Sequence, residues 1–456
     1  MLYRNRSHKG QATLLVTFAL VPMIGLLGLV TDLGYMHYLK KSAQAAADAA
    51  VLAAVSQVHS NVGGSKFTCD MVGVTCKTSY TCPTSPTADN AADIACLYAK
   101  QNGFISKGNQ SVVIDANVGT TLPANAPGVN SAAYWVTVTV SQTVPQLFSA
   151  VMGNTTGKVA AQSTAGLNPA KDCIYALDPS SIGGYYQNGN TSVTSACGVY
   201  VDSSSSSALY NSGNSTLTAS EYDIVGNYQW HGSLTPTPNV GAPSSPDPLK
   251  NLAAPSPCSS SGGCAAAACK ANSAPLVIDS DTTLNAGTYC GGIYVKKGTL
   301  TLSGTGTGIF ILVGGGLGTQ DTNSIIKGTG VFLYNTYDSK NAYQAFSLAA
   351  GSDVELSAPT SGTYAGILAM QDRTCCSTAP GSLLTESFQG GPSAKFEGTL
   401  YFPTSVIDFA GNPTVSIVHY TIVVAWQFRV LGTSTFNNDY SVLTGGSPIQ
   451  QVGLIE

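Results

Sequence analysis

The longest apolar stretch of the chain covers residues 11–30 and contains no charged side chain. A helix of this length, rising about 1.5 Å per residue, crosses about 30 Å, which is the thickness of the hydrocarbon core of a bilayer. Arg4, Arg6 and Lys9 precede the stretch, so the positive-inside bias predicts a cytoplasmic N-terminus. We therefore predict a single-pass anchor in the inner (cytoplasmic) membrane that contacts the lipid bilayer through residues 11–30, with the bulk of the chain periplasmic or extracellular.

A cleaved signal peptide is the alternative interpretation of this stretch. The apolar run is longer than the usual signal-peptide core of about 7–15 residues, and no clean A-x-A site follows it. These two features favour a retained anchor.

The residues after the apolar stretch predict that its helix continues outward. The segment Tyr35 to Val58 has no glycine or proline and is rich in alanine, the strongest helix former. Its alanines form a stripe that lets another element approach closely, either a sheet of the same chain or the helix of a partner. The stripe consists of Ala43, Ala46, Ala47, Ala50, Ala53 and Ala54.

Residues 59–170 have a mixed pattern that predicts a small α+β unit. Residues 134–140 (YWVTVTV) alternate β-branched and aromatic residues with period two, which is typical of a strand. Residues 111–118 and 158–163 also predict strands, and residues 88–101 a short helix. Residues 144–153 predict an amphipathic turn of helix, with Leu147, Phe148, Val151 and Met152 packed against the sheet or the bilayer.

From residue 171 to residue 456, short apolar stretches alternate with Gly, Asn, Ser and Thr, without clear hairpin signals. This pattern favours a parallel β-helix-like solenoid, in which neighbouring coils pair the strands of each coil. A β-sandwich is the structural alternative, because regular short strands serve both folds. Within this region, residues 231–272 are dense in Pro, Ser, Gly and Ala and predict an irregular excursion. The fold class is thus α+β, mostly β, in three parts: 1–58, 59–170 and 171–456.

Composition narrows the function classes. Only 10% of the residues are charged and the net charge is −4, so no basic surface for nucleic acid is evident. Twelve cysteines, all after the apolar stretch, predict an oxidising compartment and disulfides rather than zinc, since their spacing is irregular and the chain has only five histidines. Adjacent Cys375 and Cys376 are expected to bond elsewhere. Local candidates for disulfides are Cys173 with Cys197, and pairs among Cys258, Cys264, Cys269 and Cys290.

The sequence predicts no catalytic residue, cofactor or metal site. Asp372, Glu386, Glu397 and Asp408 could supply a carboxylate pair in a polysaccharide-degrading β-helix enzyme, but sequence places no two of them together. Asp372 beside Arg373 is interpreted as an ion pair or a cap. A surface adhesin, or an ice- or glycan-binding β-helix protein, is the stronger alternative to a structural role.

Several N-terminal residues occur in the same order as the motif residues of a known family. Gly10, a central Pro22, Asp32, Gln44 and Asp48, the last within an Ala-rich helix, resemble the N-terminal domain of TadG-like proteins. This resemblance implies a role in assembly of Flp (Tad) pili, with other pilus-assembly or envelope proteins as partners. Pseudopilins of the same system carry Glu at the fifth position after the cleaved Gly. Here that position holds a leucine, so we predict that the anchor is not cleaved.

The C-terminal region resembles the corresponding part of TadG-like proteins and, more loosely, right-handed β-helix domains. The segments that carry this resemblance include 247–249 (DPL), 287–292 (GTYCGG) and 398–403 (GTLYFP).

Overall fold

The computed structural model describes residues 9–62, 67–119, 132–259, 263–264, 269–391, 393–410, 418–443 and 446–455. It also leaves undescribed the side chains of residues 9–15, 17, 21, 22, 24–27, 151 and 152. The chain forms two compact units: residues 1–62, 67–168 and 451–456 make up unit 1, and residues 63–66 and 169–450 make up unit 2. We describe each unit by itself.

Unit 1 is built on one long helix, α1 (Lys9–Asn61), so the predicted continuation of the N-terminal helix is confirmed. The alanine stripe packs inside unit 1, where Ala46, Ala47 and Ala50 are fully buried in a core shared with helix α2 (Ala91–Gln101) and the sheet. Small side chains permit this close contact of helix and sheet. Asn90 caps α2 by accepting from two backbone N–H groups, which is why the helix begins three residues later than the sequence predicts.

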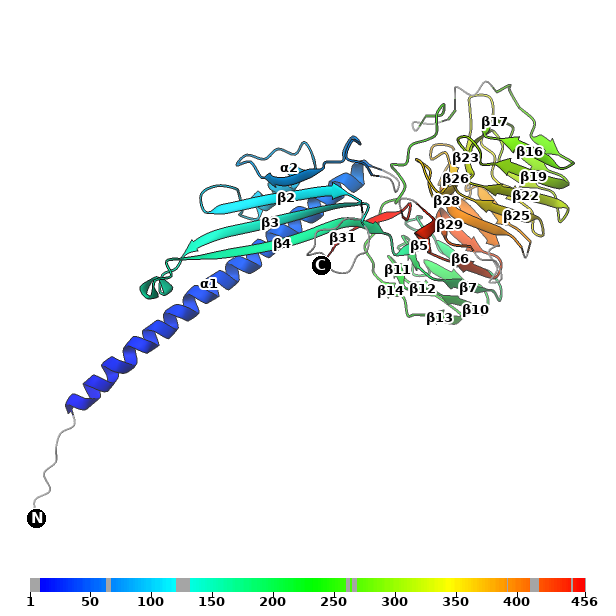
Figure 1. Ribbon diagram of the computed structural model, residues 1–456. Coiled ribbons are helices and arrows are strands. Elements are labelled where there is room, and N and C mark those ends of the chain that lie inside the picture. Colours follow the sequence, from blue (N-terminus) through cyan, green and yellow to red (C-terminus); the bar gives the residue numbers. More distant parts are fainter. Residues whose placement is uncertain are drawn as a thin grey trace, which may run out of the picture. The chain divides into compact units, whose positions relative to one another are not determined.

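The sheet of unit 1 carries the predicted strands, and its hairpin β3–β4 runs beside α1 (Figure 1). Strands β1 to β4 pair antiparallel in sequence order, with β31 next to β4. On β3, Val136, Val138 and Val140 are fully buried against the helices, as the period-two pattern requires. The bounds are β1 (Lys77–Thr81), β2 (Gln110–Val118), β3 (Tyr134–Pro145), the 3-10 helix η1 (Ser149–Met152), β4 (Thr156–Pro169) and β31 (Gln450–Leu454).

Within the described part of the chain, no helix is both long enough and apolar enough to span a membrane. Many of the side chains of the predicted anchor, residues 11–30, lie outside the described residues.

Unit 2 is a mostly β structure in which all pairings between the described strands are parallel, as the sequence predicts. The strands form three stacks, and the chain visits the stacks in turn. Stack 1 contains, in spatial order, β15 (Leu276–Ile278), β18 (Ile293–Val295), β21 (Leu317–Thr319), β24 (Ser347–Leu348), β27 (Thr385–Gln389), β28 (Lys395–Ala410), β29 (Thr421–Val430), β6 (Tyr185–Gln187), β9 (Leu209–Asn211) and β12 (Tyr228–Gln229).

The strands of the other two stacks are given in the same direction, from the end that holds β15 to the end that holds β12. Stack 2 contains β16 (Thr282–Asn285), β19 (Gly298–Ser303), β22 (Ser324–Thr329), β25 (Asp353–Ser357) and β28, and in a second part β30 (Ser434–Phe436), β7 (Ser192–Ser195), β10 (Ser215–Thr218) and β13 (Gly232–Thr235). Stack 3 contains β17 (Gly287–Cys290), β20 (Ile309–Val313), β23 (Phe332–Thr336), β26 (Ile367–Gln371), β28, β29, β5 (Asp172–Ala176), β8 (Gly198–Val201), β11 (Tyr222–Ile224) and β14 (Asn239–Val240).

The long strand β28 contributes to all three stacks because it changes stack twice, at Gly398 and again between Phe402 and Val406, where its register with β29 shifts. Residues 395–397 pair with β25, residues 399–401 with β26 and residues 406–410 with β27. Gly398 has a φ of 138°, and a β carbon there would lie 2.7 Å from Cβ of Leu368, so both the backbone angle and the space require glycine.

The order of the strands in space is not their order in sequence. The last strands of unit 2, β29 and β30, pair with its first strands, β5, β6 and β7. The chain therefore enters unit 2 in the middle of the stacks and winds outward to β14. It then restarts at the opposite end with β15 and winds back to the middle. In Figure 1, the orange and red C-terminal strands accordingly lie beside the green strands β5 and β6.

The two halves are joined by a linking segment, residues 241–275, of which 260–262 and 265–268 lie outside the described residues. Two of its carbonyl groups lie close to tyrosine hydroxyls along the way: Pro243 at 3.1 Å from that of Tyr200 and Ala253 at 3.2 Å from that of Tyr364. The sequence placed the start of this excursion at residue 231, which is too early, because β13 and β14 still pair with earlier strands.

All twelve cysteines form disulfides, as the sequence predicts. The expectation that Cys375 and Cys376 bond elsewhere is wrong, because they bond to each other at the turn that follows β26, and every other cysteine has its own partner. The remaining pairs are Cys69–Cys76, Cys82–Cys96, Cys173–Cys197, Cys258–Cys264 and Cys269–Cys290.

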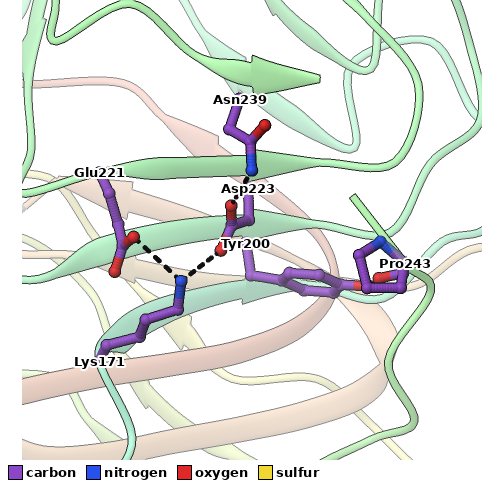
Figure 2. A network of polar contacts seen from close by, with 6 residues as sticks. All are labelled: Lys171, Tyr200, Glu221, Asp223, Asn239 and Pro243. Carbon is purple, nitrogen blue, oxygen red and sulfur yellow. Dashed lines mark hydrogen bonds and ion pairs between the residues drawn. The ribbon is translucent and has the colours of Figure 1, made fainter. Parts of the chain in front are cut away.

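A charged network borders stack 3 near the middle of unit 2 (Figure 2). The Lys171 ammonium lies 2.9 Å from Glu221 and 2.6 Å from Asp223, and Asn239 donates to Asp223 at 2.9 Å. Asp172, next to Lys171 in sequence, is buried, and one of its oxygens has no partner among the described residues. Burial raises the pKa of Asp172 to about 7, the Lys171 charge opposes the rise, and Asp223 and Glu221 add to it.

We predict that Asp172→Asn makes unit 2 less sensitive to alkaline pH. A carboxyl group whose pKa is raised in the folded state favours folding only while it is protonated, so its contribution declines as pH rises from about 4 to about 7. The variant should therefore exceed the wild type in free energy of unfolding at pH 8, by at most about 4 kcal/mol, and not at pH 4. Urea unfolding of the full chain in detergent at both pH values measures this.

Asp353→Asn is the control, since Asp353 is partly exposed and, among the described residues, its side chain accepts a hydrogen bond from the Ser393 hydroxyl alone. Some pH dependence should remain in the Asp172 variant, because burial also raises the pKa of Glu386 to about 7. An Asp172 variant with the wild-type stability difference between pH 4 and pH 8 would show that Asp172 does not titrate in this way.

Candidate functional site

The candidate site is the contact between α1 and the hairpin tip, residues 146–155, which joins β3 to β4. Asp32 lies on α1 just beyond the apolar stretch and is buried. Its carboxylate accepts from the backbone N–H groups of Leu147 at 3.2 Å, Phe148 at 3.0 Å and Ser149 at 2.8 Å. One side chain thus satisfies three successive N–H groups at the start of η1, in the manner of a helix cap supplied from another element.

These hydrogen bonds set the charge state of Asp32. The N–H of Ser149, followed by those of Leu147 and Phe148, lowers the pKa of Asp32 below its ordinary value, although partial desolvation acts in the opposite direction. The carboxylate therefore stays ionised at neutral pH, and the three charge-assisted bonds are maintained.

The contact surface on α1 is shaped for the hairpin tip. Gly28 lies one helical turn before Asp32 and is buried, and a β carbon there would collide with the Phe148 side chain. One turn after Asp32, the Met36 sulfur accepts from the Gln146 side-chain amide at 2.9 Å. Positions spaced four apart lie on one face of a helix, so Gly28, Asp32 and Met36 form a continuous surface that contacts the tip.

A small apolar cluster and a polar bond extend this contact along the hairpin. Leu39 on α1 packs against Val144 of β3 and Val159 of β4, all buried. Further along, the Gln44 amide donates to the Asp48 carboxylate at 2.8 Å and to the carbonyl of Gln162 on β4 at 3.2 Å. Asp32, Gln44 and Asp48 thus lie on the side of α1 that contacts β4 or the tip.

The remaining predicted motif positions, Gly10 and Pro22, cannot be compared with this site because their surroundings lie outside the described residues. Gly10 and Pro22 lie in α1, and the side chain of Pro22 is outside the described residues. Sequence reasoning did not identify Met36 and Gln146 as contact residues, because no local pattern pairs residues more than a hundred positions apart. The sequence did indicate that the tip region is apolar, because residues 144–153 predict an amphipathic turn of helix.

The tip also presents apolar surface. Leu147 is 72% exposed and Phe148 is 40% exposed. On the neighbouring turns of α1, Leu33, Tyr35 and Tyr38 are at least half exposed. Exposed apolar and aromatic side chains therefore gather where the helix leaves the apolar stretch.

The carboxylates considered for catalysis have other partners. Asp372 caps the turn after β26 by accepting from the N–H and hydroxyl of Thr374, and it forms no salt bridge with Arg373 among the described contacts. Glu386 is fully buried and accepts from the Tyr343 hydroxyl and the Phe346 N–H, both at 2.7 Å. Glu397 lies 2.9 Å from His419, and Asp408 lies 2.6 Å from Arg429. In the described part of the chain, no group of metal-binding side chains is found.

We predict that Asp32→Asn frees the hairpin tip. An amide carries one carbonyl oxygen and no charge, so it cannot hold three N–H groups, and the amides of Leu147, Phe148 and Ser149 should exchange with solvent several-fold faster. Hydrogen exchange of the full chain in detergent, read by mass spectrometry of the tip peptides, measures this.

Asp89→Asn, in the exposed loop before α2, is the matched control and should leave the tip peptides unchanged. Equal exchange of the tip in the wild type and in Asp32→Asn would contradict the capping role.

Comparison with known protein families gives a match in the part of the chain that contains α1. Residues 10–57 match the family described as "Putative Flp pilus-assembly TadE/G-like". The search of curated proteins and the search of solved structures gave no match. The matched segment ends inside α1 and includes Gly28, Asp32, Gln44 and Asp48. Residues 10–57 therefore form a TadE/G-like domain at the N-terminal end of the described chain.

Proposed function

We propose that the chain is a membrane-anchored envelope protein that contributes structure or interaction surface to Flp pilus assembly, secretion or surface attachment. The observation that carries the proposal is the contact of Asp32 with the hairpin tip, because it gives a family-motif residue a defined structural task. The TadE/G-like domain thereby serves as the base on which the rest of unit 1 is built.

The membrane anchor is part of this proposal. Residues 11–30 are uncharged, and α1 continues through them without interruption. Apolar and aromatic side chains such as Leu33, Tyr35 and Leu147 are exposed close to the end of this stretch, where a bilayer surface favours them. In this arrangement Asp32 lies at the membrane boundary on the non-cytoplasmic side, and the hairpin tip faces the headgroups.

Unit 2 is proposed to act as a binding or spacing module and not as an enzyme. The parallel pairing of its strands supports the proposal of a β-solenoid, a fold whose extended faces suit contact with other envelope components. The buried or paired state of the carboxylates considered for catalysis supports a structural role for them.

The anchor is tested by alkaline extraction of membranes. We expect the full chain to remain in the membrane pellet, and the double variant Phe18→Asp/Met23→Asp to appear in the wash, because two carboxylates in the hydrocarbon core oppose insertion. The double variant Val72→Asp/Tyr98→Asp, which replaces two exposed apolar side chains outside residues 11–30, is the control and should stay in the pellet. Release of the wild-type chain into the wash would refute the anchor.

The pilus role is tested in the bacterium that carries the gene. Deletion should reduce the number of surface fibres seen by electron microscopy, and the wild-type gene should restore them. Asp32→Asn, expressed at the wild-type level, should restore fewer fibres, because its hairpin tip is not fixed to α1. An unchanged number of fibres after deletion would overturn the role in pilus assembly.

A further inference from the structure

Unit 2 contains a cavity of about 370 Å³ beside stack 3. This volume falls within the range of small-molecule sites, roughly 300–1,000 Å³. One wall is formed by residues within β28 and β29 or just after β5, β8 and β26. The other wall is formed by residues 244–247 of the linking segment. The cavity thus depends on the unusual strand order, which brings Asp202 and Trp426 together although they are far apart in sequence.

One carboxylate of the cavity is held in place by its neighbours. Asp202 accepts from the Tyr200 hydroxyl at 2.6 Å and from the Ser245 N–H at 3.3 Å. The same hydroxyl oxygen accepts from the Ser245 N–H at 2.6 Å and lies 3.1 Å from the carbonyl of Pro243, and Figure 2 shows the ring extending toward Pro243. These bonds fix both Asp202 and the start of the linking segment before any ligand arrives.

A guanidinium and a second carboxylate are fixed in the same way. Arg373 donates from Nε to the Tyr401 hydroxyl and from Nη2 to the carbonyls of Leu249 and Leu252, all at 2.6 Å. Its Nη1 has no hydrogen-bond partner among the described residues. The Tyr401 hydroxyl in turn donates to Asp247 at 2.6 Å.

The cavity also has an apolar wall and a hydroxyl group. The Trp426 side chain, partly exposed, and Leu177 line it together with Thr404. A large aromatic surface next to fixed carboxylates, a guanidinium and a hydroxyl is the combination that recognises a sugar ring. The C–H groups of the sugar pack on the indole, and its hydroxyls donate to carboxylates and accept from the arginine.

We propose that this cavity binds one saccharide unit of a glycan and that neutral or amino sugars are preferred over uronic acids. The preference follows from charge, because the wall has two carboxylates, Asp202 and Asp247, and one guanidinium, Arg373, which leaves one net negative charge. The proposal concerns unit 2 alone and does not rest on the pilus role.

The test is binding of defined oligosaccharides to the full chain in detergent. The probes are an N-acetylglucosamine trimer, a glucosamine oligomer and a galacturonate oligomer, measured by titration calorimetry. We expect binding of at least one of the first two, and galacturonate at least about tenfold weaker. Trp426→Ala and Thr404→Ala should each weaken binding, the tryptophan variant by at least about tenfold, because it removes the apolar platform.

A fluorescence measurement tests the same site without replacing Trp426, so it remains informative if the Trp426→Ala variant does not fold. Trp135→Phe/Trp230→Phe leaves Trp426 as the only tryptophan of the three in the chain, and sugar binding should shift its emission. Glu355→Gln, a partly exposed residue of stack 2, is the control and should bind like the wild type. Absence of binding to all three probes by the wild-type chain would overturn the proposal. So would binding unaffected by a folded Trp426→Ala variant, or a preference for galacturonate.

Discussion

The structure of unit 1 depends on the Asp32 carboxylate and the three backbone N–H groups that it accepts. Without this contact, the first N–H groups of η1 would lack partners, and the end of a long hairpin would be held only by a few side chains. With it, the hairpin is fixed to α1 at both ends of their contact, by Asp32 at the tip and by the alanine stripe at the base. Gly28 is part of the same constraint, since any larger residue would push Phe148 away.

Unit 2 depends on a different constraint, the pairing of β29 with β5 and β6. Since these strands lie at opposite ends of the unit in sequence, neither half of the stacks is complete until the last strands are present. Contacts of such high sequence separation make folding slow, and six disulfides in the chain offset part of the entropy that must be lost. The same pairing brings Asp202 near Trp426 and so creates the cavity.

Local sequence patterns predicted many of the helices and strands of this fold, but they could not predict which strands distant in sequence pair with each other. The period-two alternation on β3 and the alanine-rich part of α1 each report burial directly, so both elements were predicted correctly. The parallel pairing followed from short apolar stretches without hairpin turns. The sequence could not predict that β5 pairs with β29, because no local signal encodes the order of coils. Asp32 was identified from its place in a family motif, but its partners at residues 147–149 became visible only in the structure.

Asp32 fixes the hairpin tip to α1, and we propose that this places the tip at a membrane surface; the depth of residue 147 tests this proposal most directly. All twelve native cysteines are in disulfides, so Leu147→Cys supplies a single thiol for a spin label in the full chain reconstituted into bilayers. Val72→Cys, in a loop near the C-terminal end of α1 and 97% exposed, is the control. We predict that the label at 147 collides more with oxygen than with a water-soluble nickel complex, and the label at 72 the reverse. A label at 147 as accessible to nickel as the label at 72 would contradict the account.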